Sequence, residues 1–229
     1  MTAVESDAAR RAALEAAERR AEALFAAIEA EGLVAPGRTE QDVSDAIFEL
    51  AAERFGVERH WHKRVIRAGP NTLTTFFDTP ENRAIAPDDT VYVDLGPVFE
   101  AWEADIGRTI ALGDDPEKKR LVADLPRVFA AVQAHYRATP DVTGAGLYAF
   151  AQKAAEEAGW VFGGAIAGHL IGEFAHHTWP IPRPQTAIAP VNETPMRGTD
   201  HLGRARHWIL EIHLVDRART FGGFYERLL

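Results

Sequence analysis

Residues 91–110 read VYVDLGPVFEAWEADIGRTI and place two acidic residues within two apolar, β-branched segments. Asp94 interrupts the first segment, and Asp105 opens the second. A Gly-Pro pair lies between the segments and favours a turn, so the pattern predicts two short strands. An ionised carboxylate in an apolar segment is costly unless it is paired or binds a cation. This stretch therefore predicts a sheet that carries acidic ligands.

Three more polar residues have similar apolar surroundings downstream. His169 lies in GAIAGHLIG, Glu211 in HWILEIHLV and Glu226 in FGGFYERLL. Taken singly, each of the five residues is better explained by a turn, a salt bridge or a hydrogen-bonded core histidine. Taken together, four carboxylates and one imidazole suit Mn, Co, Fe(II) or Zn better than a soft metal. If two such ions share the set, bridging carboxylates could hold them close together.

The whole chain, residues 1–229, is predicted to form one α+β domain, in which helices cover one face of a largely antiparallel sheet in two similar halves. Residues 1–9 are a candidate disordered tail. Helices are expected up to about residue 32, from the N-cap Thr39 to Gly56, and over 115–138 and 143–158. Strands are expected over 64–68, 90–95, 106–112 and 208–215, and the proline-rich residues 179–206 predict a long surface loop.

Composition restricts the partners and the chemistry. The 34 acidic and 25 basic residues give a formal net charge of -9, so we expect no nucleic-acid partner. The absence of cysteine excludes disulfides, thiolate zinc sites and a cysteine nucleophile. The N-terminal segment lacks the order of a secretory signal, and no apolar run approaches membrane-spanning length. We therefore expect a soluble cytoplasmic protein with no membrane partner, and a homodimer that helps to wall the pocket.

These motifs resemble those of the "pita-bread" metallohydrolases, the superfamily of methionine aminopeptidases, Xaa-Pro peptidases and creatinase. The eleven-residue step from Asp94 to Asp105, followed by Ile-Gly-Arg-Thr, matches the superfamily's first metal signature. The segment around His169 resembles its histidine motif, and Glu211 and Glu226 resemble its last two ligands. The resemblance covers nearly the whole chain and implies the pita-bread fold.

The resemblance also implies a site for two divalent ions, of Mn, Co, Fe or Zn. Asp94 would bind one ion and His169 with Glu211 the other, whereas Asp105 and Glu226 would bridge the two. A hydroxide held by both ions would attack the carbonyl carbon of an amide-type bond in a small-molecule or peptide substrate, with Glu211 handling the proton.

The resemblance further implies how the substrate pocket is lined. His176, seven residues after His169, matches the superfamily's second histidine, which hydrogen-bonds the substrate. Members usually carry another histidine before the first metal-binding strand, where this chain has Phe76 and Phe77. We expect these phenylalanines to pack against the substrate, although neither can donate a hydrogen bond.

Four other residues near the motifs have less direct assignments. His60 and His62 lie too far upstream to replace the missing histidine unless a loop brings one back, and are otherwise expected in solvent or at a strand edge. His213 alternates with Glu211 along a strand, so it either enters the pocket or pairs across the sheet. Tyr225, beside the last ligand, is expected to contact the substrate.

Three functions stay open from the sequence. The leading hypothesis is a metal-dependent hydrolase close to aminopeptidases and proline peptidases. A specialised non-peptidase metalloenzyme, such as a lyase or an amide or amidine hydrolase, is the alternative, because the substrate-facing histidine and the Pro-Gly turn after Glu211 are missing. The third hypothesis is a catalytically silent binding module that retains the fold.

Overall fold

In the computed structural model, the described residues run from Ser6 to Leu229. They form four α-helices, and three short 3-10 helices lie in the connections between the longer elements. The α-helices are α1 (Asp7–Ala30), α2 (Glu40–Phe55), α3 (Pro116–Ala138) and α4 (Gly144–Glu157). The 3-10 helices are η1 (Gly69–Leu73), η2 (His176–Thr178) and η3 (Arg183–Thr186).

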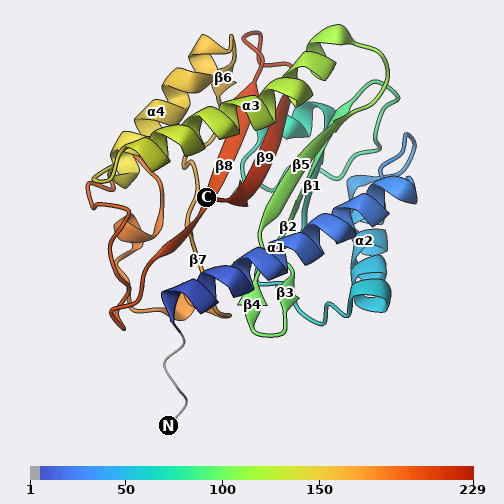
Figure 1. Ribbon diagram of the computed structural model, residues 1–229. Coiled ribbons are helices and arrows are strands. Elements are labelled where there is room, and N and C mark those ends of the chain that lie inside the picture. Colours follow the sequence, from blue (N-terminus) through green and yellow to red (C-terminus); the bar gives the residue numbers. More distant parts are fainter. Residues whose placement is uncertain (1–5) are drawn as a thin grey trace.

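The strands form one main sheet and one small hairpin. They are β1 (Val65–Ala68), β2 (Thr90–Leu95), β3 (Val98–Phe99), β4 (Trp102–Glu103), β5 (Ile106–Ala111), β6 (Val161–Phe162), β7 (Leu170–Ile171), β8 (His207–Val215) and β9 (Gly222–Leu228). The main sheet has the order β1-β2-β5-β9-β8-β6, and β7 also pairs with β8. All these pairings are antiparallel, and β3 pairs with β4 outside this sheet. The predicted α+β class is confirmed (Figure 1).

Capping residues begin the first two helices. The Thr39 side chain accepts a hydrogen bond from the Asp42 N–H, and the Asp42 side chain accepts one from the Thr39 N–H, which forms a capping box for α2. The Ser6 side chain caps α1, which begins at Asp7. The expected disordered tail is therefore wrong for residues 7–9, and residues 1–5 lie outside the described part of the chain.

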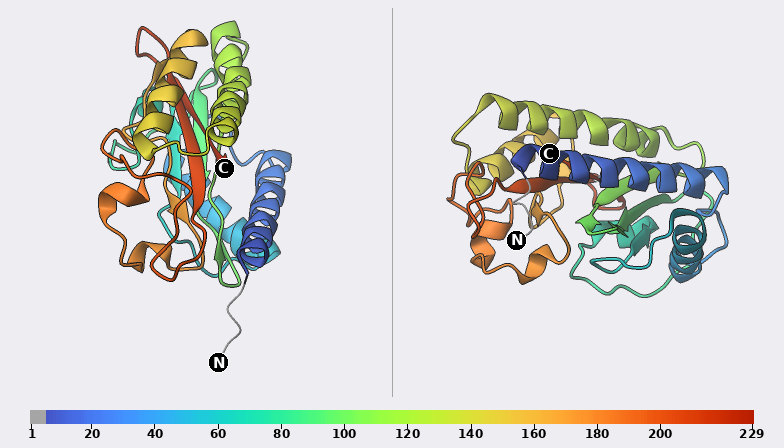
Figure 2. Two further views of the ribbon diagram at one scale, coloured as in Figure 1. Left: turned by 60° about the vertical axis from the view of Figure 1, so that its left-hand side comes forward. Right: turned by 60° about the horizontal axis from the view of Figure 1, so that its bottom comes forward.

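The helices form one layer over the sheet (Figures 1 and 2). Alternation along β2 explains the two different faces, because Val91, Val93 and Leu95 join the buried cluster under α1 and α2. Tyr92 and Asp94 point the other way and line a cavity. A second buried cluster packs α3 and α4 on β8. The helices therefore seal one face of the sheet and leave the other face for the site.

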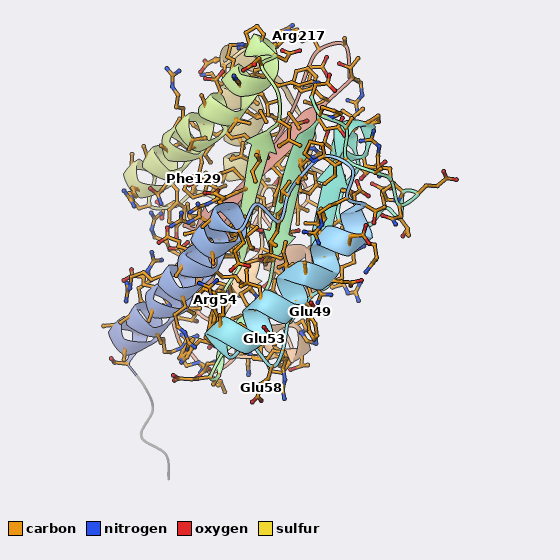
Figure 3. The ribbon with its side chains drawn as sticks, turned by 90° about the vertical axis from the view of Figure 1, so that its right-hand side faces the viewer. Glu49, Glu53, Arg54, Glu58, Phe129 and Arg217 are labelled. Atoms are coloured by element: carbon orange, nitrogen blue, oxygen red, sulfur yellow. The ribbon has the colours of Figure 1, made fainter. Side chains whose placement is uncertain are left out.

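The outer surface of α2 shows the same division between apolar and charged faces. Glu49, Glu53 and Arg54 are exposed on the outer side of α2 (Figure 3). Val43 and Ile47 of the same helix are buried. Among the described helices, none combines the length and the apolar composition that a bilayer span requires.

The two halves of the sheet meet along a narrow seam between β5 and β9. Within the described chain, this ladder has one register pair, Gly107 with Glu226. Beside it, the Thr109 hydroxyl donates to the Phe224 carbonyl and accepts from the Phe224 N–H, at 2.8 Å and 2.7 Å. A side chain thus replaces part of the backbone ladder at the centre of the sheet.

Candidate metal centre

Three carboxylates form one row across four neighbouring strands. Asp94 of β2 pairs with Gly107 of β5, Gly107 pairs with Glu226 of β9, and Glu226 pairs with Glu211 of β8. Residues that pair directly place their side chains on the same face of a sheet. Asp105 precedes Gly107 by two residues and joins this face, because side chains alternate along a strand. The carboxylates therefore converge on the face that the helices leave uncovered.

Gly107 is the member of the row without a side chain, and its position requires this. A Cβ atom there would lie 2.5 Å from Cδ1 of Phe224 and 3.0 Å from Cβ of Glu226. Contacts this short would displace both side chains. The glycine therefore leaves the room in which the acidic side chains approach one another.

His169 immediately precedes β7 and adds an imidazole to the row. Its Nε2 lies 3.0 Å from Oδ2 of Asp105, 3.6 Å from Oε1 of Glu211 and 3.7 Å from Oε1 of Glu226. The Leu170 carbonyl lies 2.7 Å from Nδ1 and can accept a hydrogen bond from the Nδ1–H group. A hydrogen bond from Nδ1 to a carbonyl is usual for metal-binding histidines, and it leaves Nε2 as the nitrogen that would bind an ion in place of its proton. The structure thus brings together all five residues that the sequence singled out as ligands.

His62 also enters the cluster, so of the two alternatives left open for it the loop does bring it back, and the position in solvent or at a strand edge is wrong. Its Nε2 lies 3.1 Å from Oδ1 of Asp105 and 3.5 Å from Oδ1 of Asp94, and its side chain is only 6% exposed. The preceding segment runs antiparallel to the connection between β2 and β3, since the Trp61 N–H donates to the Gly96 carbonyl. This loop places His62 beside residues more than thirty positions downstream.

Burial and mutual repulsion set the protonation of these carboxyl groups. Burial raises the pKa of Asp94 to about 7, the pKa of Glu211 to about 7, and the pKa of Glu226 well above its usual range. Without bound cations these carboxyl groups are therefore partly or fully protonated near neutral pH. Bound cations would favour their ionised forms.

The imidazoles shift in the opposite sense. Burial disfavours the charged form of His62, yet the nearby Asp94 and Asp105 carboxylates raise its pKa to about 9. Burial likewise opposes the charge on Asp105, but the contacts with His62 and His169 hold its pKa below the usual range. Asp105 is therefore the carboxylate that stays ionised between the two histidines.

Two observations test whether these residues fit divalent ions. Within the described chain, Oδ1 of Asp94 and Oε2 of Glu226 are buried and receive no hydrogen bond. Such oxygens are costly to bury unless a cation or a donor satisfies them. In addition, atoms about 2.1 Å from one ion lie about 3.0 to 3.4 Å apart in octahedral or tetrahedral geometry. The imidazole-to-carboxylate distances given above lie in or close to this range, so the residues fit.

The cluster lies at the floor of a cavity of about 530 Å³, a size typical of sites for small ligands. Aromatic side chains line much of its wall, and they include the predicted residues Phe76 and Phe77. Trp61 is one of these side chains, and its ring lies 5.2 Å from that of His169 and 5.0 Å from that of His176. The cavity thus combines a polar floor with an apolar wall.

His176, the predicted substrate-binding histidine, lines the cavity on η2. The fully buried Glu103 accepts hydrogen bonds from both the backbone N–H and Nδ1 of His176, the first at 3.1 Å. These two contacts fix the ring, so that Nε2 lies on the side away from Glu103. The ring also stacks parallel to that of His169, with 6.0 Å between the centroids.

The outcomes for His213 and Tyr225 differ. His213 lines the cavity, but its Nε2 lies 2.7 Å from the Thr72 carbonyl and ties β8 to η1. The predicted contact of Tyr225 with the substrate is wrong, because its ring packs against Phe129 of α3 on the helix side of the sheet. Its neighbour Glu226 faces the cavity, and adjacent residues of a strand face opposite sides.

Two residues of the site, Trp61 and Glu103, were not predicted from the sequence, and His62 was named only as one that a loop could bring near. A signal for Glu103 exists, because it precedes Asp105 by two residues and period-two alternation places both on one face. The loop before β1 offers no comparable signal. Its partner strand lies more than thirty residues away, and no local pattern specifies that pairing.

Comparisons with known proteins agree with this geometry. Residues 12–199 match the model of metallopeptidase family M24. The Xaa-Pro dipeptidase of Lactobacillus helveticus is 28% identical over 144 residues, which cover 61% of this chain and 38% of that protein. The Xaa-Pro dipeptidase of Lactobacillus delbrueckii subsp. lactis is 29% identical over 127 residues, 54% of this chain and 33% of that protein. Each match thus spans only about a third of the relative.

Solved structures share the fold. Dipeptidase PepE from Mycobacterium ulcerans superimposes with a TM-score of 0.72 at 24% identity, covering 99% of this chain and 56% of that chain. Methionine aminopeptidase from Rickettsia prowazekii gives a TM-score of 0.69 at 15% identity, covering 96% of this chain and 92% of that chain. The predicted pita-bread fold is confirmed. Because the family model matches most of its length, the chain belongs to metallopeptidase family M24.

Proposed function

We propose that this chain is a metal-dependent hydrolase that cleaves an amide bond of a small molecule or short peptide. The row of carboxylates on the cavity floor carries the proposal. We assign Asp94 to one ion, His169 and Glu211 to the other, and Asp105 and Glu226 to both. Mn, Co, Fe and Zn all suit such oxygen and nitrogen donors. When bound, two ions would polarise the scissile carbonyl and activate a water molecule.

Glu211 is the candidate proton carrier. Burial raises its pKa to about 7, so its carboxyl group can gain or lose a proton near neutral pH. Its side chain is 16% exposed and lines the cavity, so a substrate can reach it. Glu211 would accept a proton from the attacking water and transfer it to the departing amine.

His176 would bind the oxygen on which negative charge develops. With Nδ1 directed at Glu103, the opposite ring nitrogen, Nε2, would donate a hydrogen bond to the substrate oxygen. Because Glu103 also accepts the backbone N–H of His176, the ring needs little reorganisation during the reaction.

The cavity wall favours a substrate with an apolar part. Trp61, Phe76 and Trp179 offer aromatic surface beside the cluster. Dipeptides, including those with a C-terminal proline, are the first substrates to test, because the two relatives named above are Xaa-Pro dipeptidases. A specialised non-peptidase reaction is the second candidate, since Phe76 occupies a wall position where a histidine was expected.

The test compares purified protein before and after removal of metals with a chelator. After reloading with Mn²⁺ or Co²⁺, the wild type should bind two ions and hydrolyse at least one dipeptide of a panel. Asp105→Asn should lose both ions, because Asp105 lies between the two histidines. Asp114→Asn is the matched control, since the Asp114 side chain is 99% exposed and pairs with Lys119.

Each outcome separates the hypotheses. Two bound ions without cleavage of any peptide would favour the non-peptidase reaction. A wild type that binds no divalent ion would refute the hydrolase proposal and favour a silent binding module. The homodimer and the cytoplasmic location remain predictions.

A further inference from the structure

His62 and His169 have the same arrangement at opposite ends of Asp105. The Nε2 atom of His62 lies 3.1 Å from Oδ1 of Asp105, and that of His169 lies 3.0 Å from Oδ2. On the far side of each ring, Nδ1 lies near the carbonyl of the next residue, at 2.6 Å from Lys63 and 2.7 Å from Leu170. Both rings can therefore donate from Nδ1 to a carbonyl, which leaves Nε2, the nitrogen beside the carboxylates, as the atom that would bind an ion after losing its proton.

This hydrogen bond from Nδ1 is typical of a metal ligand that binds through Nε2. A metal-binding histidine usually donates its second ring N–H to a carbonyl or carboxylate, which fixes the orientation of the ring. The carbonyl of Lys63 provides the fixed orientation for His62.

The distances around His62 match those of ligands on one ion. Its Nε2 lies 3.1 Å from Asp105 and 3.5 Å from Asp94, and Oδ1 of Asp94 receives no hydrogen bond from any described residue. One ligand atom from each of these three residues lies within 4.8 Å of the ligand atoms of the other two. Asp94 thus has an unsatisfied oxygen directed to the same point as the imidazole.

The surroundings hold His62 in this place. The Trp61 indole N–H donates to the Ala104 carbonyl at 3.1 Å, and its ring packs against His62 with 4.4 Å between the centroids. Gly96 makes room for the imidazole, because a Cβ there would lie 2.2 Å from Cδ2 of His62. The Trp61 ring and the backbone at Gly96 therefore hold the His62 ring from two sides.

We propose that His62 is a sixth protein ligand of the metal centre and binds, with Asp94 and Asp105, the ion on the Asp94 side. This inference rests on the two-metal site of the proposed function. Each ion then has one imidazole, His62 for the first and His169 for the second, and Asp105 connects the two. The added nitrogen donor would favour transition metals over Mg²⁺ or Ca²⁺ at the Asp94 position.

The experiment measures the binding of Co²⁺ to protein whose metals have been removed with a chelator. It uses calorimetry and elemental analysis and needs no activity readout. The wild type should bind two ions. His62→Ala should bind the ion on the Asp94 side at least about tenfold more weakly, since even the loss of an indirect partner of a ligand costs about 10- to 100-fold in affinity. The other ion should remain.

His60→Ala is the matched control, since it removes an imidazole two residues away. The His60 ring lies 6.1 Å from that of Phe48, and His60 is not among the residues that line the cavity. This variant should bind both ions with wild-type affinity. Proton NMR of the Co²⁺-loaded wild type adds a measurement that needs no variant. Each imidazole bound through Nε2 should give one strongly shifted, exchangeable Nδ1–H resonance, so two are expected.

The outcomes distinguish this inference from the proposed function. Two bound ions and two shifted resonances, with weakened binding and one resonance lost in His62→Ala, would support the sixth ligand. Two bound ions with one shifted resonance, and unchanged affinities in His62→Ala, would overturn it and leave the hydrolase proposal standing. A wild type that binds no ion would refute both.

Discussion

Replacing Gly107 by alanine tests whether the bare position in the ligand row is required. The new Cβ would lie 2.5 Å and 2.6 Å from two ring carbons of Phe224 and 3.0 Å from Cβ of Glu226. Because Phe224 and Glu226 lie on a central strand, neither can move far without disturbing the seam. Overpacking of this kind costs about 1 to 3 kcal/mol.

The two consequences can be measured separately. For a domain of this size, a loss of about 1 kcal/mol lowers the melting temperature by about 2 to 4 °C, so Gly107→Ala should melt about 2 to 12 °C lower. The measurement uses metal-free protein, because bound ions stabilise the fold by mass action. In a second assay, the affinity for Co²⁺ should fall, since displacement of Glu226 moves a ligand of both proposed ions.

A double substitution shows whether the contact itself is responsible. Phe224→Ala removes the closest atoms and should cost stability by leaving a cavity. In that background, Gly107→Ala should cost much less than in the wild type, because the ring that it strikes is absent. A Gly107→Ala protein that melts and binds Co²⁺ like the wild type would refute the reasoning, as would equal costs in both backgrounds.

Three further predictions concern individual groups. Burial raises the pKa of both Asp94 and Glu211 to about 7, so protons compete with Co²⁺ for these carboxylates below this pH. Calorimetry should therefore show the affinity for Co²⁺ rising from about pH 6 to about pH 8. An affinity that does not change with pH would contradict the assignment. Glu103→Gln should lower kcat by about 10- to 100-fold with KM and metal content unchanged, because it weakens the hold on the His176 ring; an unchanged kcat would remove that role. His213→Ala should cost about 2 to 4 kcal/mol in denaturant unfolding but leave metal content intact, since Thr72 loses its buried partner; loss of an ion instead would make His213 part of the centre.

Much of the fold could be predicted because local signals agree with the tertiary structure. Thr39 marks the start of α2 through its own capping bonds, and Asp115 does the same for α3. The strands around Asp94 and Asp105 have β-branched segments bounded by turn residues. By contrast, β9 was not delimited, because it begins with Gly222 and Gly223, residues with low strand propensity.

The site was predictable where ligands lie within regular strands. Spacing and apolar context selected five candidate ligands, namely Asp94, Asp105, His169, Glu211 and Glu226. The sheet register brings those on the strands together. His62 could not be found in this way, because its position depends on a loop that pairs with residues 96 to 98. The error for Tyr225 has a simple cause, since a neighbour of a ligand on a strand faces the other side.

The seam between β5 and β9 gives the candidate ligands a further significance. Asp94 and Asp105 belong to the half before α3, whereas His169, Glu211 and Glu226 belong to the half after it. Neither half has a complete set, and within the main sheet β5 and β9 join them at one register pair. Ions bound here would cross-link the two halves. Removal of the ions should therefore lower the local stability of the central strands before that of the edge strands.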